Sequence, residues 1–326
     1  MGSNKKRVLS GIQPSGHLHL GNYFGMMSKM IEYQEEEDLF CFVADFHALT
    51  ANQNSKVLSS NTYDAVCDFI ALGLKPEKTT FWVQSDVSEV TELAWILSSF
   101  TTVGLMDRST TYKDKIAKGI KPNMGLYSYP ILMAADILLF NSNLVPVGKD
   151  QKQHIEMARD IANKFNGNYG DIFTLPEPDI VKETQLIPGI DGQKMSKSYN
   201  NTIPIFGEDK VIRKKVMSII TDNASVNEPK DKNTPLFYLY SLFADSNEKQ
   251  LLSEKYDSSG LRYGDLKLEL YEKIMDYFAP FRQERALLHS KPDDVKDILK
   301  LGAKKAKLVA FEMLDKIRSA IGLRLF

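Results

Sequence analysis

The sequence contains few of the residues and segments that mark several classes of protein. Its 326 residues include only two cysteines, Cys41 and Cys67, both inside apolar segments. Two cysteines exclude a disulfide framework, a four-cysteine zinc site and an iron–sulfur cluster, and they fit a reducing cytoplasm. The longest apolar stretch, residues 127–140, is shorter than the roughly 20 residues that cross a bilayer. Residues 1–7 are basic without an apolar core, so we expect no secretion signal and no membrane partner.

The chain also lacks an excess of charge of either sign. It carries 41 Lys and Arg residues against 42 Asp and Glu residues, a formal net charge of −1. This balance excludes a uniformly basic nucleic-acid coat but allows a local basic patch. The apolar fraction of 43% and the charged fraction of 25% are ordinary for a protein with a hydrophobic core. At about 150 residues per domain, the length predicts two domains.

Short apolar runs alternate with amphipathic segments in the first half of the chain. The runs predict strands at 7–10, 39–45, 79–85 and 144–147. The segments between and after them predict helices at 22–34, 55–72, 89–100, 128–140 and 150–165. This alternation favours an α/β fold, in which a parallel sheet is covered by helices on both faces.

After about residue 200 the strand pattern fades. The amphipathic segments there predict only helices, at 211–221, 235–243, 248–256, 263–279 and 293–321. The composition changes within a loop at 190–205 that is rich in Gly, Lys, Ser and Asn, and this loop is the predicted domain boundary. The second part is therefore expected to be a helical bundle appended to the α/β domain.

A glycine-rich segment, residues 10–23 (SGIQPSGHLHLGNY), joins the first predicted strand to the first predicted helix. Ligands of open parallel sheets bind beyond the carboxyl ends of the strands. Gly11, Gly16 and Gly21 would let the backbone approach a phosphate, and the helix N-terminus would offer free N–H groups. The spacing matches neither the dinucleotide fingerprint nor the P-loop. A glycine-rich turn with incidental histidines is the alternative.

A second motif, Lys194-Met195-Ser196-Lys197-Ser198, lies in the predicted boundary loop. Flexible lysines beside a phosphate chain can stabilise the charge that builds on a departing pyrophosphate. A solvated basic loop is the alternative. At average residue usage, however, this pentapeptide should occur by chance in on the order of one in 10⁴ chains of this length.

Together the two segments resemble the signatures of the class I aminoacyl-tRNA synthetases. Residues 17–22 (HLHLGN) stand where that family has its first signature, with Asn22 in place of the final histidine, and residues 194–198 match the second signature letter for letter. Residues 10–16 (SGIQPSG), 133–138 (MAADIL) and 145–154 (VPVGKDQKQH) resemble most closely the bacterial tryptophanyl branch. The resemblance is dense over residues 8–205 and thinner beyond.

The resemblance implies a fold and a reaction. The expected fold is a Rossmann-type catalytic domain over residues 1–195 and a smaller all-helical anticodon-binding domain over 196–292, with a C-terminal helix at about 293–326 packed back on the first. The expected reaction joins L-tryptophan to tRNA(Trp), with ATP and its Mg²⁺ as substrate complex, in a cytoplasmic homodimer. We expect no protein-bound metal, because no ligand spacing relates the five histidines, His17, His19, His47, His154 and His289.

Asp136 is the residue that we expect to select the amino acid. It lies in the apolar segment 130–140, where a carboxylate is costly unless it is paired. The indole N–H is only a donor and needs an acceptor, and a buried acceptor left unpaired would reject phenylalanine. Met133 lies one turn earlier and Tyr129 two turns earlier, as candidate walls. An aspartate that caps a neighbouring element or pairs with an arginine is the alternative.

Residues 148–151 (GKDQ) follow a predicted strand and begin a helix. Gly148 allows close approach of the backbone, Asp150 can accept from ribose hydroxyls, and Gln151 can bond the substrate ammonium or the ribose. Lys149 stands where the resembling family often has an acidic residue. Capping of the helix by Asp150 alone is the alternative.

The remaining site predictions come from the resemblance. The predicted catalytic residues are Lys194, Lys197 and Lys115. The predicted ATP contacts are Gln13, Pro14, Ser15, Gly21, Asn22, Gly148, Lys149, Asp150, Ile187, Lys194, Met195, Ser196, Lys197 and Ser198. The predicted tryptophan contacts are Asp136, Met133, Tyr129, His47, Gln151, Leu9, Gly11, Val145 and Val147. Ordinary structural roles are the alternatives: sheet core for the aliphatic residues and a solvated face for Lys115.

A local basic excess marks the end of the chain, where residues 296–326 hold eight Lys and Arg residues against three acids. This excess can track tRNA phosphates, or it can be the solvated face of an amphipathic helix. Three rival functions stay open: a tyrosyl-tRNA synthetase, another nucleotidyltransferase of the same superfamily, and a catalytically inactive synthetase-like RNA-binding module.

Overall fold

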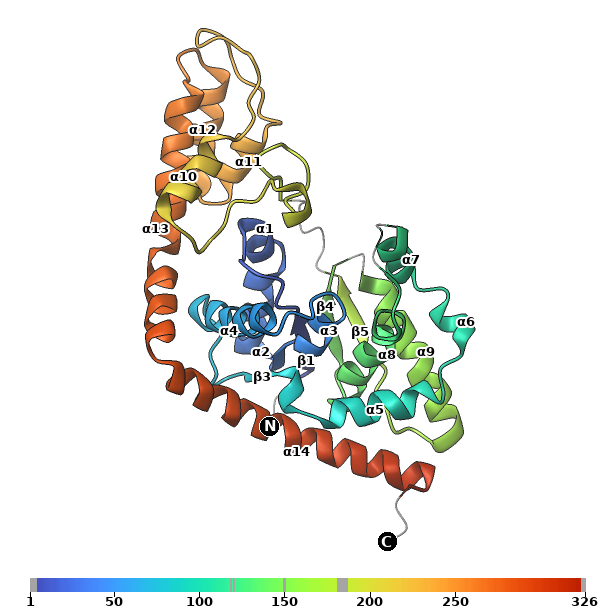
Figure 1. The fold of residues 1–326 in the computed structure, drawn as a ribbon. Helices are drawn as coiled ribbons and strands as arrows, with labels where there is room; N and C mark the ends of the chain where they lie inside the picture. The colour runs from blue at the N-terminus through green and yellow to red at the C-terminus, as the bar shows by residue number, and fades with distance from the viewer. Residues whose placement is uncertain (1–4, 118, 120, 149–150, 181–186, 324–326) are drawn as a thin grey trace. The chain divides into compact units, whose positions relative to one another are not determined.

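The computed structural model describes residues 5–117, 119, 121–148, 151–180 and 187–323 (Figure 1). The chain forms two compact units, each built from separate stretches of sequence. The first, here called the sheet unit, comprises Met1–Gly16, Lys29–Lys182 and Leu288–Phe326. The second, the helical unit, comprises His17–Ser28 and Glu183–Leu287.

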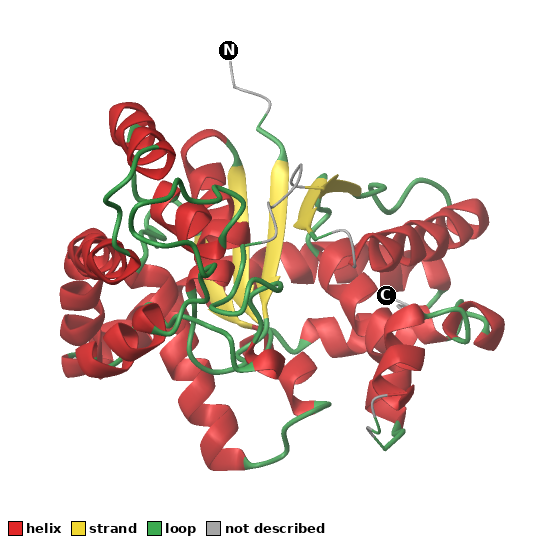
Figure 2. Cartoon of the chain, turned by 90° about the horizontal axis from the view of Figure 1, so that it is seen from above, coloured by secondary structure: helices red, strands yellow, loops and turns green. Residues whose placement is uncertain are grey.

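The sheet unit is built on a five-stranded sheet in the order β3-β2-β1-β4-β5, and every neighbouring pair of strands is parallel. Its strands are β1 (Arg7–Ile12), β2 (Asp38–Val43), β3 (Thr80–Val83), β4 (Leu144–Val147) and β5 (Glu177–Ile180). In Figure 2 the strands lie side by side between helices. The predicted parallel α/β fold is therefore confirmed. β5 was not predicted, because its sequence EPDI contains no apolar run.

Helices connect the strands and pack against the sheet and against one another. Those of the sheet unit are α2 (Ser28–Glu36, which begins at the unit boundary), α3 (Asp45–Leu49), α4 (Ser55–Ala71), η2 (Gln84–Asp86), α5 (Glu89–Ser98), α6 (Val103–Met106), α7 (Thr110–Ala117), α8 (Met124–Leu139), α9 (Lys152–Tyr169) and α14 (Pro292–Ile321). Side-chain caps fix the starts of α4 and α8, for example. Asn54 accepts from the Val57 N–H at 3.1 Å, and Asn123 accepts from the Leu126 N–H at 2.8 Å, so each satisfies an otherwise free helix donor.

α8 and α14 form the core against the sheet. α8 is apolar nearly all round and is buried at Ala134, Ala135 and Leu139, as expected of a helix enclosed on every side. α14 packs against β3 at Gly302, where an added Cβ would lie 1.7 Å from the carbonyl oxygen of Phe81. Only glycine therefore allows this close approach of helix and strand.

The helical unit contains α1 (Leu20–Asn22), the π-helix η1 (Tyr23–Met27), η4 (Lys197–Tyr199), α10 (Asp209–Met217), α11 (Pro235–Ser241), α12 (Ser246–Asp257) and most of α13 (Tyr263–Ser290). Two sequence predictions differ from this. The single helix expected at 22–34 is divided among α1, η1 and α2. α13 continues past the predicted end at residue 279, because Pro280 lies inside the helix without ending it.

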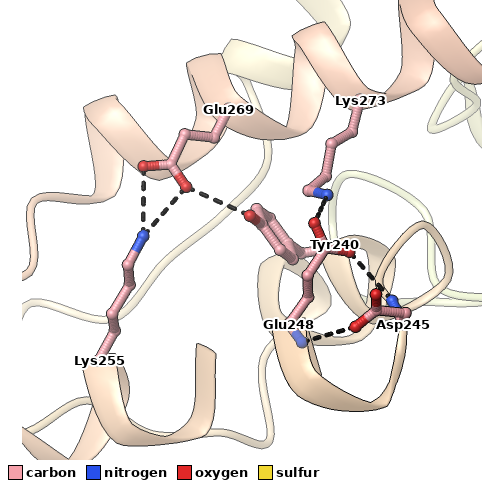
Figure 3. Close-up of polar contacts among 6 residues, drawn as sticks. All are labelled: Tyr240, Asp245, Glu248, Lys255, Glu269 and Lys273. Carbon is pink, nitrogen blue, oxygen red and sulfur yellow. Dashed lines mark hydrogen bonds and ion pairs between the residues drawn. The ribbon is translucent and has the colours of Figure 1, made fainter. Parts of the chain in front are cut away.

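A polar network joins α11, α12 and α13 (Figure 3). Lys273 donates to Glu248 at 2.6 Å, and Glu248 also completes a capping box with Asp245 at the start of α12. On the other side, Glu269 accepts from Lys255 at 3.3 Å and from the Tyr240 hydroxyl at 3.3 Å. These pairs are partly exposed, so they set the register of the three helices more than they add stability.

The compact units have different bounds from the predicted domains. Residues 17–28 and 187–195, which the sequence placed in the catalytic domain, lie with the helical unit. Backbone pairing explains the first of these: Leu20 N–H donates to the Ile203 carbonyl at 3.0 Å, and Ile205 N–H donates to the Leu18 carbonyl at 3.1 Å. Over the part of the chain that the structure describes, none of the helices combines the length and apolar character needed to cross a membrane.

Candidate functional site

A buried carboxylate lies at the carboxyl edge of the sheet. Asp136 on α8 is 3% exposed. The His47 Nε2 atom forms a hydrogen bond with its Oδ2 at 2.9 Å, and Gln84 Nε2 donates to both carboxylate oxygens at 2.8 Å. His47 and Gln84 follow the ends of β2 and β3, which is where ligands of parallel sheets bind. Two strand ends thus hold one carboxylate from a neighbouring helix.

The pKa of Asp136 lies above its ordinary value, chiefly because the carboxyl group is buried. The hydrogen bonds from His47 and Gln84 and the charge of His47 offset part of this increase. The nearby carboxylate of Asp45 adds to the increase. The oxygens of this carboxyl group are held by two side chains and are placed to accept a hydrogen bond from a substrate N–H.

Gln84 was missed by the sequence predictions. The side chain is 1% exposed, and its Oε1 atom has no hydrogen-bond partner among the described residues. A buried acceptor without a partner calls for an explanation, and a substrate donor would provide one. The available signal was a polar residue directly after the apolar strand TFWV.

Two of the predicted tryptophan contacts pack beside this carboxylate. Tyr129 lies edge-on to His47, with ring centroids 6.1 Å apart, and its hydroxyl bonds His154 Nε2 at 2.6 Å. The structure therefore brings together Asp136, His47 and Tyr129, and adds His154 behind Tyr129.

The other predicted tryptophan contacts belong to the same unit. Leu9, Val145 and Val147 are buried in the core cluster, and Met133 is partly buried against it. At Gly11 an added Cβ would lie 2.5 Å from the Phe42 ring. Packing against this ring therefore already accounts for a glycine at this position. Binding roles for these five residues stay predictions.

The first signature meets the second within the helical unit. The Gly21 N–H points at the Met195 sulfur at 3.2 Å, and a Cβ on Gly21 would lie 3.0 to 3.1 Å from His19 and Met195. His19 Nδ1 is buried and has no hydrogen-bond partner among the described residues. Burial, together with the charge of Lys197, lowers the pKa of His19 to about 4, so the ring is neutral near pH 7.

The second signature turns one side chain inward and its lysines outward. Met195 is 4% exposed and its N–H donates to the carbonyl of Ile187, itself buried, at 2.8 Å. Lys194 and Lys197 are exposed. Ser196 Oγ accepts from the Ser198 N–H at 3.3 Å and starts η4. Two cations on a folded loop can follow the charge of a polyphosphate.

Other predicted ATP contacts are found in both units. Gln13, Pro14 and Ser15 form a turn in the sheet unit, in which Ser15 N–H donates to the Gln13 carbonyl at 2.8 Å. Asn22 Oδ1 accepts from the His19 N–H at 3.1 Å in the helical unit.

The segment before α9 is described in part. Gln151 N–H donates to the Gly148 carbonyl at 3.0 Å. Lys149, Asp150 and the side chain of Lys115 lie outside the described residues. Within the described ranges, no group of three or more His, Cys, Asp or Glu side chains is arranged to hold a metal ion.

Several known proteins are similar to this chain over most of its length. A family model described as tRNA synthetases class I (W and Y) matches residues 2–279. The tryptophan–tRNA ligase of Fusobacterium nucleatum is 50% identical over 319 residues, which cover 98% of this chain and 98% of the relative. That of Rhodopirellula baltica is 49% identical over 319 residues, which cover 98% and 100% of the two chains.

A solved structure is similar over the same span. The crystal structure of Campylobacter jejuni tryptophanyl-tRNA synthetase complexed with ADP and tryptophan matches with a TM-score of 0.94 and 48% identity. The match covers 97% of this chain and 99% of that chain.

Proposed function

This chain belongs to the class I tRNA synthetases of the tryptophan and tyrosine group, and on that premise we propose that it is a tryptophan–tRNA ligase. The observation that carries the proposal is its similarity to tryptophan–tRNA ligases over nearly the whole chain, at 50% identity to one of them. The buried carboxylate of Asp136 supplies the chemical reason for the choice of amino acid.

In the first step the tryptophan carboxylate attacks the α-phosphorus of ATP. The bond between the α-phosphorus and its bridging oxygen breaks, which gives tryptophanyl-adenylate and pyrophosphate. No protein nucleophile is needed, so the enzyme contributes alignment and charge stabilisation. Lys194, Lys197 and Lys115 are proposed to stabilise the departing pyrophosphate of ATP, which enters with Mg²⁺ as part of the substrate.

Binding of the nucleotide is assigned to the backbone and polar groups around the signatures. The turn at 13–15, Gly21 with Asn22, and the segment 148–151 are proposed to hold ATP, with Ile187 and residues 194–198 beside the phosphates. Tight backbone turns and helix starts suit this role because they present N–H groups to phosphate oxygens.

Recognition of tryptophan is assigned to the sheet unit. Asp136 accepts the indole N–H, His47 and Gln84 hold that carboxylate in place, and Tyr129 and Met133 wall the ring together with Leu9, Gly11, Val145 and Val147. Gln151 is proposed to bind the ammonium group. The indole N–H is a donor that a phenyl ring lacks, so a fixed buried acceptor, which phenylalanine would leave unpaired, discriminates between them.

In the second step a hydroxyl of the terminal ribose of tRNA(Trp) attacks the carbonyl carbon of the adenylate and AMP leaves. We assign anticodon recognition to the helical unit, and we expect the active form to be a cytoplasmic homodimer. The basic excess on α14 is compatible with contacts to tRNA phosphates.

Amino-acid-dependent ATP–pyrophosphate exchange tests the proposal directly. With each amino acid in turn, only tryptophan should support exchange well above background, and tRNA(Trp) should then accept the product. Exchange with tyrosine instead would favour a tyrosyl-tRNA synthetase. Binding of tRNA without any exchange would favour an inactive RNA-binding module.

A further inference from the structure

The second signature is part of a closed loop, residues 187–201, which we call the lysine loop. Gly189 N–H donates to the Gln193 carbonyl at 2.7 Å, and Met195 N–H donates to the Ile187 carbonyl at 2.8 Å. Gly192 adopts a φ of 78°, which favours glycine and allows the tight turn. The backbone that carries the lysines is therefore shaped before any substrate arrives.

One buried side chain, Asn201, closes this loop. Asn201 is 1% exposed. Its Oδ1 accepts from the Ser196 N–H at 2.7 Å, and its Nδ2 donates to the Lys194 carbonyl at 3.0 Å and to Asp191 Oδ1 at 2.8 Å. The amide thus holds the backbone on both sides of Met195 while the two lysine side chains remain exposed.

The chemistry of this position favours an amide over other groups. One end must accept a hydrogen bond while the other donates two, which a carboxylate or a hydroxyl cannot do. An aspartate here would face the carboxylate of Asp191 at the distance where Asn201 now donates. The space is also fitted to this side chain, since a Cβ on Gly189 would lie 2.3 Å from Asn201 Nδ2.

We propose that Asn201 is a positioning residue for amino-acid activation, which sets the backbone that carries Lys194 and Lys197 toward the polyphosphate of ATP. This inference rests on the proposed function. Asn201 acts through the loop and touches no substrate. Its loss should therefore slow the step in which charge builds on pyrophosphate and leave tryptophan binding intact.

The test is the isosteric change Asn201→Asp, compared with Asn200→Asp. Asn200 is exposed, and its oxygen atoms accept from Lys215 at 2.8 and 3.1 Å, so an aspartate there keeps its partner. In tryptophan-dependent ATP–pyrophosphate exchange we expect Asn201→Asp to lower kcat about 30-fold, because a misplacement of about 1 Å can cost 100-fold. Asn200→Asp should stay within threefold of the unaltered enzyme.

Two further variants separate positioning from general damage. Asp191→Asn removes the facing carboxylate, so combined with Asn201→Asp it should recover at least threefold of the lost rate, although alone it changes little. Gly189→Ala pushes a methyl group into Asn201 and should reproduce the loss in kcat. In all variants the Kd for tryptophan, measured by equilibrium dialysis without ATP, should stay within twofold.

Three outcomes count against the inference. They are full exchange activity of Asn201→Asp, a loss of tryptophan affinity equal to the loss of kcat, and no recovery in the double variant. Absence of tryptophan-dependent exchange in the unaltered enzyme would instead refute the proposed function.

Discussion

The carboxylate site of the sheet unit is buried, whereas the lysine side chains of the loop in the helical unit are exposed. Asp136 is 3% exposed and its hydrogen-bond donors come from the ends of two strands. Lys194 and Lys197 are exposed on a loop whose backbone is held by the side chain of Asn201. Recognition of one N–H needs an acceptor that is fixed and shielded from water. Charge that shifts along a polyphosphate during the reaction is better stabilised by long, flexible side chains. Selectivity and rate should therefore respond to different substitutions.

The largest expected effect is on rate. Replacing both Lys194 and Lys197 by alanine should lower kcat for pyrophosphate exchange by about 10³-fold or more, since removal of a single stabilising group commonly costs 10²- to 10³-fold. Tryptophan binding without ATP should be unchanged. Lys214→Ala, an exposed lysine on α10, is the matched control, and an equal loss there would contradict the assignment.

The next effect concerns stability in acid, in the helical unit. Burial lowers the pKa of His19 to about 4, from 6.5. The unfolded chain therefore binds this proton first, so stability is complete above about pH 6.5 and declines as the pH falls toward 4. The decline attributable to His19 is roughly 3 kcal/mol. Denaturant unfolding followed by far-ultraviolet circular dichroism should show a flatter pH dependence for His19→Gln, and an unchanged slope would contradict it.

A substitution of Asp136 should affect the binding of tryptophan. Asp136→Asn removes a charge that two donors face, and it should raise the KM for tryptophan about 100-fold while the fold is retained. The KM for ATP should change little. Exchange measured over a range of tryptophan concentrations decides this, and activation indistinguishable from that of the unaltered enzyme would show that Asp136 is not the indole acceptor.

The smallest expected effect is on tryptophan binding by a variant of Gln84, one of the two side chains that hold Asp136. Gln84→Met keeps the volume but removes the hydrogen bond that lowers the pKa of Asp136. That pKa should then rise further, so the loss of tryptophan binding on acidification should begin at a higher pH. At neutral pH we expect the KM for tryptophan to rise about tenfold. A pH profile of kcat/KM with an unmoved acid limb would exclude this role.

Much of the sheet unit follows from its sequence. Short apolar runs identified β1 to β4, and Asp136 was identifiable because a charge within the apolar segment that forms α8 demands partners. The partners themselves were harder to find. Gln84 becomes significant only when the ends of β2 and β3 are placed beside α8, and that proximity depends on the strand order.

The helical unit was predictable in its elements more than in its details. Helical periodicity identified α10 to α13, but the π-helix η1 and the passage of α13 through Pro280 depend on packing. Both signatures were visible as letters. Their contact at Gly21 and Met195 could not be predicted, and neither could the closure of the lysine loop by Asn201. Both depend on hydrogen bonds between residues of loops, which have no pattern in the sequence.

The close packing of α14 on β3, at Gly302 and Phe81, has a consequence for the folding of the chain during synthesis. β3 is the outer strand on its side of the sheet, and an uncovered outer strand invites pairing with other chains. The helix that shields it, Pro292–Ile321, comes much later in the chain than β3. During synthesis the border is therefore protected only after this helix has been made, and premature termination before Pro292 should yield aggregates.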